Sequence, residues 1–268
     1  MNKIGFIGLG VMGEPIARRL LQQQYPLTVF DTDESPLERV RAAGAAVAQH
    51  PLDIARRCNT VFIMVRNEEQ VDEVLFGNDG MAPALTPEHG VILLSTLSAG
   101  YVKDLTDKLP SIPILDAPVS GGRAGAESGQ LTIMAGADPV YFEKFKRQLD
   151  LIGNQITYVG EVGAGQTAKA ANQIIIALTR AAVGEAMMFA RQNEVDPEIV
   201  RKAIATGLAG SATLDSYGPR ITKLDNPVQF NSEILAKDVN NIARAASKLG
   251  LDLPFLNLVR DAYNSSLE

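Results

Sequence analysis

The stretch KIGFIGLGVMGEPIARRL, Lys3 to Leu20, joins a short apolar strand to a helix through three regularly spaced glycines. Gly8, Gly10 and Gly13 form the pattern G-x-G-x-x-G. The first glycine of this pattern permits a tight turn, the second lets the backbone approach a pyrophosphate, and the third lets the helix pack closely on the strand. The N–H groups that begin the helix then face the anion. The pattern alone is a weak sign of dinucleotide binding, so its surroundings decide.

An acidic residue follows the second predicted strand where a dinucleotide-binding fold requires one. Asp31 ends the run LTVFD, and the acid about 20 residues after the glycines accepts hydrogen bonds from ribose hydroxyls in such folds. A 2′-phosphate would meet Asp31 and Asp33 there, with no nearby arginine to neutralise it. We therefore predict dinucleotide binding, with NAD preferred over NADP. The glycine turn contributes Gly8, Leu9, Gly10, Val11, Met12 and Gly13 to the predicted cofactor site.

The first half of the chain alternates short apolar runs with helical segments. Runs bounded by Gly, Pro and Asp are typical of buried strands, and their alternation with helices predicts a mainly parallel sheet covered by helices. The further runs are PLTVFD, TVFIMV, GVILLST, PILDAPVS, LTIMAG and QITYVG, and helices are expected near 11–23, 35–44 and 68–76.

After Gly160 the pattern becomes helical. From Gln166 to about Gln192 the sequence is rich in Ala, Ile, Leu and Met, lacks proline and has one glycine, which predicts one long buried helix. The sequence therefore predicts an α/β Rossmann-type dinucleotide-binding domain followed by an all-helical domain, joined by this long helix. Later helices are expected at 197–206, 236–249 and 254–265, the first domain spans residues 1–162, and the substrate and dimerisation domain spans 163–268.

Composition excludes several classes of protein. The net charge of −6 provides no basic field for nucleic acid or an anionic membrane. One cysteine and two histidines argue against a disulfide, a Cys-x-x-Cys motif, a histidine metal site and a histidine-centred triad. No uninterrupted apolar run approaches the roughly 20 residues of a membrane span, and the N-terminus does not resemble a signal peptide. We expect a cytoplasmic protein whose mature chain begins at Met1, with no bound metal.

Four blocks of the sequence resemble the β-hydroxyacid dehydrogenases, a family that includes 3-hydroxyisobutyrate dehydrogenase and tartronate semialdehyde reductase. The first is the opening glycine turn, and the most specific is DAPVSGGRAGAESGQLTIMAGA at 116–137. GAGQTAKAANQ at 163–173 and AKDVNNIARAASKLGLDLP at 236–254 follow in the order of the family. The resemblance spans nearly the whole chain, and it also implies a chain that continues past residue 268 with a final helix.

The resemblance assigns the chemistry to one face of the long helix. Lys169 matches the family's general acid–base lysine, and Asn172 matches an asparagine that helps to position the substrate and the lysine. These two residues stand at i and i+3, so they share a helix face. A lysine can exchange a proton near neutral pH if burial or a neighbouring cation lowers its pKa. The alternative from the residues alone is a surface lysine on an amphipathic helix.

A glycine-rich turn supplies the predicted substrate site. The Ser120 hydroxyl and the N–H groups of Gly121 and Gly122 follow a strand end, and together they can hold a carboxylate. The next residue, Arg123, is a candidate for a second carboxylate or hydroxyl contact. A glycine-rich turn without ligand is the alternative for this stretch. By resemblance, the cofactor site further includes Met64, Val65, Thr96 and Lys237, with Lys237 beside the nicotinamide.

One residue departs from the family pattern, and one segment bears on the substrate specificity that we expect for this chain. Arg66 stands where many members carry a proline or a small polar residue. A contact with a second anionic group of the substrate or cofactor is one alternative for Arg66, and we favour a solvated side chain. The segment 207–221 occupies the region that lines the substrate pocket in relatives, and its Ser211, Thr213 and Ser216 favour a hydroxylated substrate.

The favoured function is hydride transfer between NAD and a small anionic 3-hydroxyacid or its semialdehyde, of the 3-hydroxyisobutyrate, serine, glycerate/tartronate semialdehyde or threonate type. One alternative is an imine reductase on the same fold, but such relatives generally replace the lysine at the position of Lys169. Another is a non-catalytic dinucleotide sensor, which would be expected to lose Lys169 or Ser120. A 6-phosphogluconate dehydrogenase would need a much longer helical domain. The long apolar helix predicts a homodimer or homotetramer that buries it between subunits.

Overall fold

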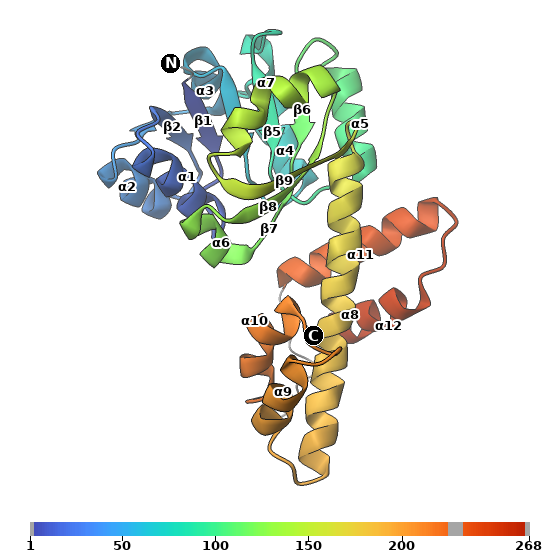
Figure 1. Cartoon of the computed structure of the whole chain (residues 1–268). Helices are drawn as coiled ribbons and strands as arrows, with labels where there is room; N and C mark the ends of the chain where they lie inside the picture. Colours follow the sequence, from blue (N-terminus) through green and yellow to red (C-terminus); the bar gives the residue numbers. More distant parts are fainter. Residues whose placement is uncertain (1–2, 225–232, 266–268) are drawn as a thin grey trace. The chain divides into compact units, whose positions relative to one another are not determined.

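The computed structural model describes residues 3–224 and 233–265 (Figure 1). The chain divides into two compact units, of which the first ends at Lys169 and the second begins at Ala170. The division falls within the long helix α8, Ala164–Gln192, which is drawn in yellow in Figure 1. The domain boundary that we expect from the sequence, after residue 162, lies earlier in the chain and stays a prediction.

The first unit is a sheet covered by helices. Its strands are β1 (Ile4–Ile7), β2 (Leu27–Phe30), β3 (Ala46–Val47), β4 (Thr60–Ile63), β5 (Gly90–Leu93), β6 (Ile114–Asp116), β7 (Val119–Ser120), β8 (Leu131–Gly136) and β9 (Gly153–Gly160). Its helices are α1 (Gly13–Gln22), α2 (Glu34–Ala42), α3 (Pro51–Arg57), α4 (Glu68–Phe76), the short 3-10 helix η1 (Ala82–Ala84), α5 (Ala99–Lys108), α6 (Gly122–Ser128) and α7 (Pro139–Leu149).

The sheet has the strand order of a Rossmann fold, as the sequence predicts. Within the described residues the order is β3-β2-β1-β4-β5-β6-β8-β7, and β9 pairs with β8. The strands from β3 to β6 are parallel, whereas β8 runs antiparallel to β6 and β7. The chain leaves β1 toward β2 on one side and later returns to β4 on the other. The carboxyl ends of these strands therefore flank the switch point where such sheets bind ligands.

Two glycines of the opening pattern are required by the turn between β1 and α1. Gly8 has φ 92°, a backbone conformation that residues with a side chain rarely adopt. A Cβ at Gly13 would collide with the carbonyl oxygen of Gly8, so only glycine lets α1 begin this close to the strand end. The spacing of the motif thus follows from the close approach of backbone to backbone.

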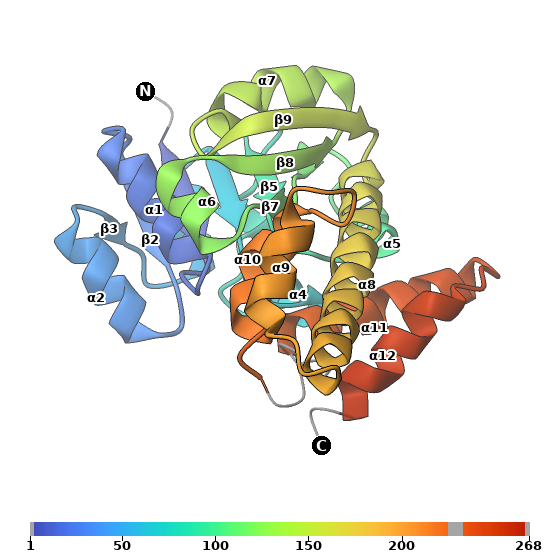
Figure 2. The same ribbon diagram turned by 60° about the horizontal axis from the view of Figure 1, so that its bottom comes forward.

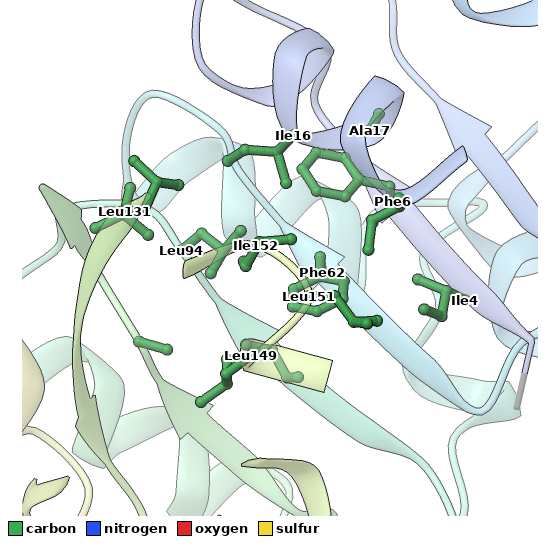
Figure 3. Packing of buried hydrophobic residues seen from close by; sticks show 14 of the residues in the cluster. Ile4, Phe6, Ile16, Ala17, Phe62, Leu94, Leu131, Leu149, Leu151 and Ile152 are labelled. Carbon is green, nitrogen blue, oxygen red and sulfur yellow. The ribbon is translucent and has the colours of Figure 1, made fainter. Parts of the chain in front are cut away.

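Apolar side chains form a separate cluster on each side of the sheet. Figure 3 shows the larger cluster, in which Ile16 and Ala17 of α1 lie over Phe6 and Phe62 of adjacent strands. The rings of Phe6 and Phe62 have their centroids 5.9 Å apart. The second cluster gathers side chains such as Ile63 with residues of α3, α4 and α5. Burial on both faces explains why the central strands read as continuous apolar runs.

The second unit is helical throughout its described residues. Besides the rest of α8 it contains α9 (Pro197–Ala205), α10 (Ala212–Ile221), α11 (Glu233–Lys248) and α12 (Pro254–Ser265). Figure 2 shows α9 beside α10, and α11 beside α12. Two small apolar clusters fill this unit, one around Leu256 and Tyr263 and the other around Met187 and Leu214. The Tyr263 hydroxyl donates a hydrogen bond to the Ala177 carbonyl oxygen at 3.2 Å.

The segment 207–221, whose hydroxyl side chains favour a hydroxylated substrate in the sequence analysis, is mostly helix. Ser211 caps α10, because its hydroxyl accepts a hydrogen bond from the Leu214 N–H at 3.0 Å. Pro219 lies inside the helix, and this residue hides the helical pattern in the sequence. The Ser211 hydroxyl therefore has a structural role that the sequence reading did not foresee.

By length and composition alone, α8 could cross a membrane. The sequence analysis finds no candidate membrane span, because it considers only uninterrupted apolar runs. The helix instead spans 29 residues and has few charges in its most apolar stretch. That stretch is 39% buried within the structure. In the second unit Ala177, Val183 and Met187 of α8 pack in the two apolar clusters, as in a core helix.

Candidate active site

A groove of about 810 Å³ opens at the carboxyl ends of the central strands. It lies where β1, β2 and β4 meet the start of α1, which is the switch point of the sheet. Its lining includes Gly8, Leu9, Gly10, Val11, Glu14, Asp31, Asp33, Arg39, Met64, Val65, Arg66 and Arg123. The groove thus brings Gly8, Leu9, Gly10 and Val11 of the predicted glycine turn together with Asp31, Met64 and Val65, whereas Met12 and Gly13 do not line it.

The groove fits the pyrophosphate of a dinucleotide at Gly10. A Cβ placed on Gly10 would meet no atom within 4 Å, so the space in front of this backbone is open. Gly10 is exposed, and it comes just before the N-terminus of α1 at Gly13. An anion there would face backbone N–H groups and the positive end of the helix dipole.

Asp31 holds the glycine turn in place. Its Oδ2 accepts a hydrogen bond from the Leu9 N–H, and its Oδ1 accepts one from the Asp33 N–H at 2.8 Å. The carboxylate has about four acceptor positions, so these bonds leave room for a ribose hydroxyl. Asp33 in turn caps α2 by accepting from the Ser35 N–H at 3.0 Å. The carboxylate that we expect to bind ribose therefore also fixes the loop around the pyrophosphate.

An arginine does reach this end of the groove, contrary to the sequence expectation. Arg39 of α2 lines the groove, and its Nη2 and Nε lie 2.8 and 3.0 Å from the Glu14 carboxylate. Its Nη1 donates to the Ser35 hydroxyl at 2.6 Å. Hydrogen bonds from Arg39 hold the pKa of Glu14 below its usual value. Arg66, which we expect to be solvated, is exposed and also lines this groove.

The loops after β4 and β5 are linked to each other. The Met64 N–H donates to the Ile7 carbonyl oxygen at 2.8 Å, which continues the sheet, and the Val65 N–H donates to the Ser95 hydroxyl at 2.9 Å. Thr96 follows Ser95 and is half-buried, outside the groove lining. Its place in the cofactor site, which the resemblance implies, stays a prediction.

Lys169 reaches the predicted substrate turn. The side chain is buried, with 6% of the residue exposed, and its Nζ donates to the Val119 carbonyl oxygen at 2.8 Å. Val119 immediately precedes Ser120, the last residue of β7. Gly121 and Gly122 follow in a turn with φ 129° and 61° that leads into α6. The buried amino group of Lys169 therefore lies against the backbone of the turn that carries the candidate carboxylate-binding groups.

Arg123 lies on the side of the cofactor groove. Its Nε is 2.7 Å from Oε1 of Glu127, one turn further along α6, and both side chains are exposed. The guanidinium is thus engaged within its own helix. The substrate contact that we predict for Arg123 stays untested by this geometry.

In the second unit Asn172 and Lys237 belong to one polar chain. The Asn172 amide donates to Gln173 Oε1 at 3.1 Å, and the Gln173 amide donates to Asp238 Oδ2 at 2.7 Å. Lys237 Nζ lies 3.2 Å from the other carboxylate oxygen of Asp238. Gln173 and Asp238 are buried, so they fix the side chains that the sequence singles out on α8 and α11.

Comparison with known proteins agrees with this arrangement. A family model described as the NAD binding domain of 6-phosphogluconate dehydrogenase matches residues 3–160. A second model, described as NAD-binding of NADP-dependent 3-hydroxyisobutyrate dehydrogenase, matches residues 163–268. The 2-hydroxy-3-oxopropionate reductase of Escherichia coli strain K12 is 37% identical over 98% of this chain and 90% of its own length. The chain belongs to the β-hydroxyacid dehydrogenase family.

Two further relatives of the β-hydroxyacid dehydrogenase family cover the chain almost completely. The NAD-dependent L-serine dehydrogenase of Pseudomonas aeruginosa is 30% identical over 100% of this chain and 93% of its own. The crystal structure of 3-hydroxyisobutyrate dehydrogenase from Salmonella typhimurium has a TM-score of 0.88 and 27% identity, and the match covers 99% of this chain and 94% of that one. These matches agree with the Rossmann and all-helical parts described above.

The family comparison defines the cofactor only as NAD or NADP. The two model descriptions name a NAD binding domain and an NADP-dependent enzyme, so they show a dinucleotide-binding domain without separating the two cofactors. The model named for 6-phosphogluconate dehydrogenase matches only residues 3–160. Among residues 3–224 and 233–265, no three His, Cys, Asp or Glu side chains are grouped so that they could hold a metal.

Two buried residues of the first unit are not among the site residues that the sequence predicts. Asp116 ends β6, and its carboxylate accepts hydrogen bonds from the Gly163 and Gln166 N–H groups at 2.8 and 2.7 Å. Burial raises the pKa of Asp116 to about 7, against the lowering effect of these backbone hydrogen bonds. Gln166 is 2% exposed on the first turn of α8. Both residues stand inside the blocks shared with the β-hydroxyacid dehydrogenases, and this position is the only signal that the sequence offers.

Proposed function

We propose that this chain is an NAD-preferring dehydrogenase or reductase of small 3-hydroxyacids in which Lys169 is the general acid and base. The family assignment makes it an NAD(P)-dependent oxidoreductase of small hydroxyacids. One observation carries the finer proposal: the buried Lys169 ammonium lies 2.8 Å from the backbone carbonyl oxygen that precedes Ser120.

The roles of the residues follow from where charge and protons must go. In our proposal the Ser120 hydroxyl and the N–H groups of Gly121 and Gly122 bind the carboxylate of the substrate. Lys169 gives its proton to the carbonyl oxygen during reduction, and its neutral amine takes the hydroxyl proton during oxidation. Asn172 orients the substrate oxygen toward Lys169. The nicotinamide, when bound, supplies or accepts the hydride at the hydroxyl-bearing carbon.

The proposal is tested by NAD-linked turnover of a panel of acids. We expect NADH formation from at least one of 3-hydroxyisobutyrate, serine, glycerate and threonate, or NADH consumption with the matching semialdehyde or, for threonate, the matching 3-oxoacid. L-Lactate is the control, because its hydroxyl is one carbon nearer to the carboxylate and should be misplaced relative to Lys169. If the chain oxidises lactate best, the position of the hydroxyl in our proposal is wrong.

Asp31 should set the preference for NAD. The change Asp31→Asn keeps an acceptor for the Leu9 N–H but removes the charge that repels a 2′-phosphate. We expect the ratio of kcat/KM for NAD to that for NADP to fall about tenfold or more, which corresponds to about 1.4 kcal/mol of lost discrimination. Asp138→Asn is the matched control, because Asp138 caps α7 by accepting from the Val140 N–H at 2.8 Å outside the groove lining. An unchanged ratio in Asp31→Asn would place the ribose contact elsewhere.

We further propose that the chain forms a homodimer or a homotetramer through its helical unit. Large apolar side chains of α8, α9 and α12 are more than half exposed, which is unusual for a surface that faces only water. Examples are Ile175, Phe189, Ile199, Phe255 and Leu258.

The single cysteine, Cys58, is buried and unpaired, which is compatible with the cytoplasmic location that we propose.

Sedimentation velocity at micromolar concentration should give the mass of two or four chains. The double change Phe189→Glu and Phe255→Glu should shift the protein toward the monomer, because each new charge would have to be buried at the interface. Val140→Glu is the control, since Val140 is an equally exposed apolar residue of the first unit. A wild-type protein that sediments only as a monomer would contradict this proposal.

A further inference from the structure

Gln166 stands on the same face of α8 as Lys169. The two residues are separated by three positions, so their side chains leave the helix one turn apart in nearly the same direction. Gln166 is 2% exposed, and Lys169 is 6% exposed. A buried amide must have partners for both its donor and its acceptor, and those partners fix how it lies.

Both ends of the Gln166 amide bind the backbone of the loop after β5. Its Oε1 accepts from the Leu97 N–H at 2.9 Å, and its Nε2 donates to the Ser95 carbonyl oxygen at 2.9 Å. Ser95 also accepts from the Val65 N–H at 2.9 Å through its hydroxyl, and Val65 lines the dinucleotide groove. A continuous set of hydrogen bonds, buried at Gln166 and part-buried at Val65, therefore runs from the groove to the first turn of α8.

Asp116 attaches the same turn to a different strand. Its two carboxylate oxygens accept from the Gly163 and Gln166 N–H groups at the start of α8. The helix dipole at the start of α8 also favours the ionised form of this carboxylate, against the burial that raises its pKa to about 7. The end of β6 thus holds the backbone of Gln166, while the loop after β5 holds its side chain.

We propose that Gln166 is a positioning residue that sets where the Lys169 ammonium lies, by tying the first turn of α8 to the loop after β5, while Asp116 ties that turn to the end of β6. This inference rests on the proposed role of Lys169. Loss of the Gln166 contacts frees the turn to shift, and the Lys169 ammonium then leaves its place against the Val119 carbonyl oxygen. A displacement of about 1 Å between reacting groups is enough to lower a rate roughly 100-fold.

The first test separates chemistry from cofactor binding. Gln166→Met fills the same space without hydrogen bonds, and we expect kcat to fall roughly 10- to 100-fold. The Kd for NADH, measured by calorimetry, should change less than about threefold, because Gln166 is outside the groove lining. Gln148→Met is the matched control, since Gln148 is a buried glutamine of α7 that does not belong to this network. An unchanged kcat in Gln166→Met would overturn the inference.

The second test does not depend on turnover. Acetic anhydride labels accessible lysines, and mass spectrometry compares the labelling of Lys169 with that of the exposed Lys146 in each variant. We expect slow labelling of Lys169 in the wild type and in Gln148→Met, and labelling at least about tenfold faster in Gln166→Met and Asp116→Asn, because opening of the turn exposes the ammonium. Circular dichroism confirms that each variant is folded.

The two tests distinguish two kinds of failure. If the wild type turns over no acid of the panel, but Lys169 labelling still rises in Gln166→Met, the proposed function fails and the positioning role remains. If labelling of Lys169 is the same in all folded variants, Gln166 does not position this lysine. Gln166→Glu keeps the acceptor for the Leu97 N–H and should give kcat and labelling between those of the wild type and Gln166→Met.

Discussion

Lys169→Ala should abolish turnover and leave cofactor binding intact. General acid–base catalysis contributes about 100- to 10,000-fold to a rate, and we expect kcat to fall within or beyond this range. The Lys169 Nζ donates to the Val119 carbonyl oxygen at 2.8 Å, beside the turn that we propose to bind the substrate carboxylate. The Kd for NADH should be unchanged within about threefold, because Lys169 does not line the dinucleotide groove.

Two matched variants make the Lys169 result interpretable. Lys146→Ala removes an exposed lysine that pairs with Asp150 at 3.0 Å, and its kcat should equal that of the wild type. Lys169→Arg keeps the positive charge but cannot release its proton, so it should lose oxidation of the hydroxyacid as Lys169→Ala does. If Lys169→Ala turns over at the wild-type rate, another group transfers the proton.

Gly10→Val should block the dinucleotide without unfolding the chain. Nothing lies within 4 Å of a Cβ at Gly10, and its φ is not positive, so the folded protein should accommodate the side chain. The new side chain would instead occupy the space that a pyrophosphate needs. We expect the affinity for NADH to fall on the order of 100-fold, equal to about 2.8 kcal/mol.

The control for Gly10→Val is another open glycine. Gly100, on the first turn of α5, is also exposed, and a Cβ there meets no atom within 4 Å. Gly100→Val should therefore bind NADH as tightly as the wild type, and both variants should unfold within a few degrees of the wild-type Tm. Equal NADH affinity in Gly10→Val and the wild type would show that the cofactor does not pass over the glycine turn.

The sequence is most informative where structure follows from neighbouring residues. The spacing of Gly8, Gly10 and Gly13 reflects a turn of only a few residues, and the apolar runs report strands buried on both faces, so the Rossmann part can be predicted. In the second unit α10 is missed, because Pro219 and the serines around it suggest a loop. The function of Ser211 as a helix cap becomes visible only when the helix itself is seen.

Contacts between distant residues explain what the sequence does not reveal. Asp116 and Gln166 are separated by 50 positions, and Gln166 meets Leu97 across 69 positions, so no local pattern reports their hydrogen bonds. Arg39 is 25 positions from Glu14, and only the packing of α2 beside α1 brings its guanidinium to the groove. The residue that we propose to transfer the proton can be named from a motif, whereas the residues that we propose to position it are found only in the fold.

Transfer of deuterium to NAD tests the central claim most directly. A 3-hydroxyacid that is deuterated at its hydroxyl-bearing carbon is incubated with NAD and the wild type or Lys169→Ala, and the NADH is analysed by mass spectrometry. Our account predicts NADH that carries one deuterium from the wild type and none above background from Lys169→Ala. Unlabelled NADH from the wild type, or labelled NADH formed equally fast by Lys169→Ala, would contradict it.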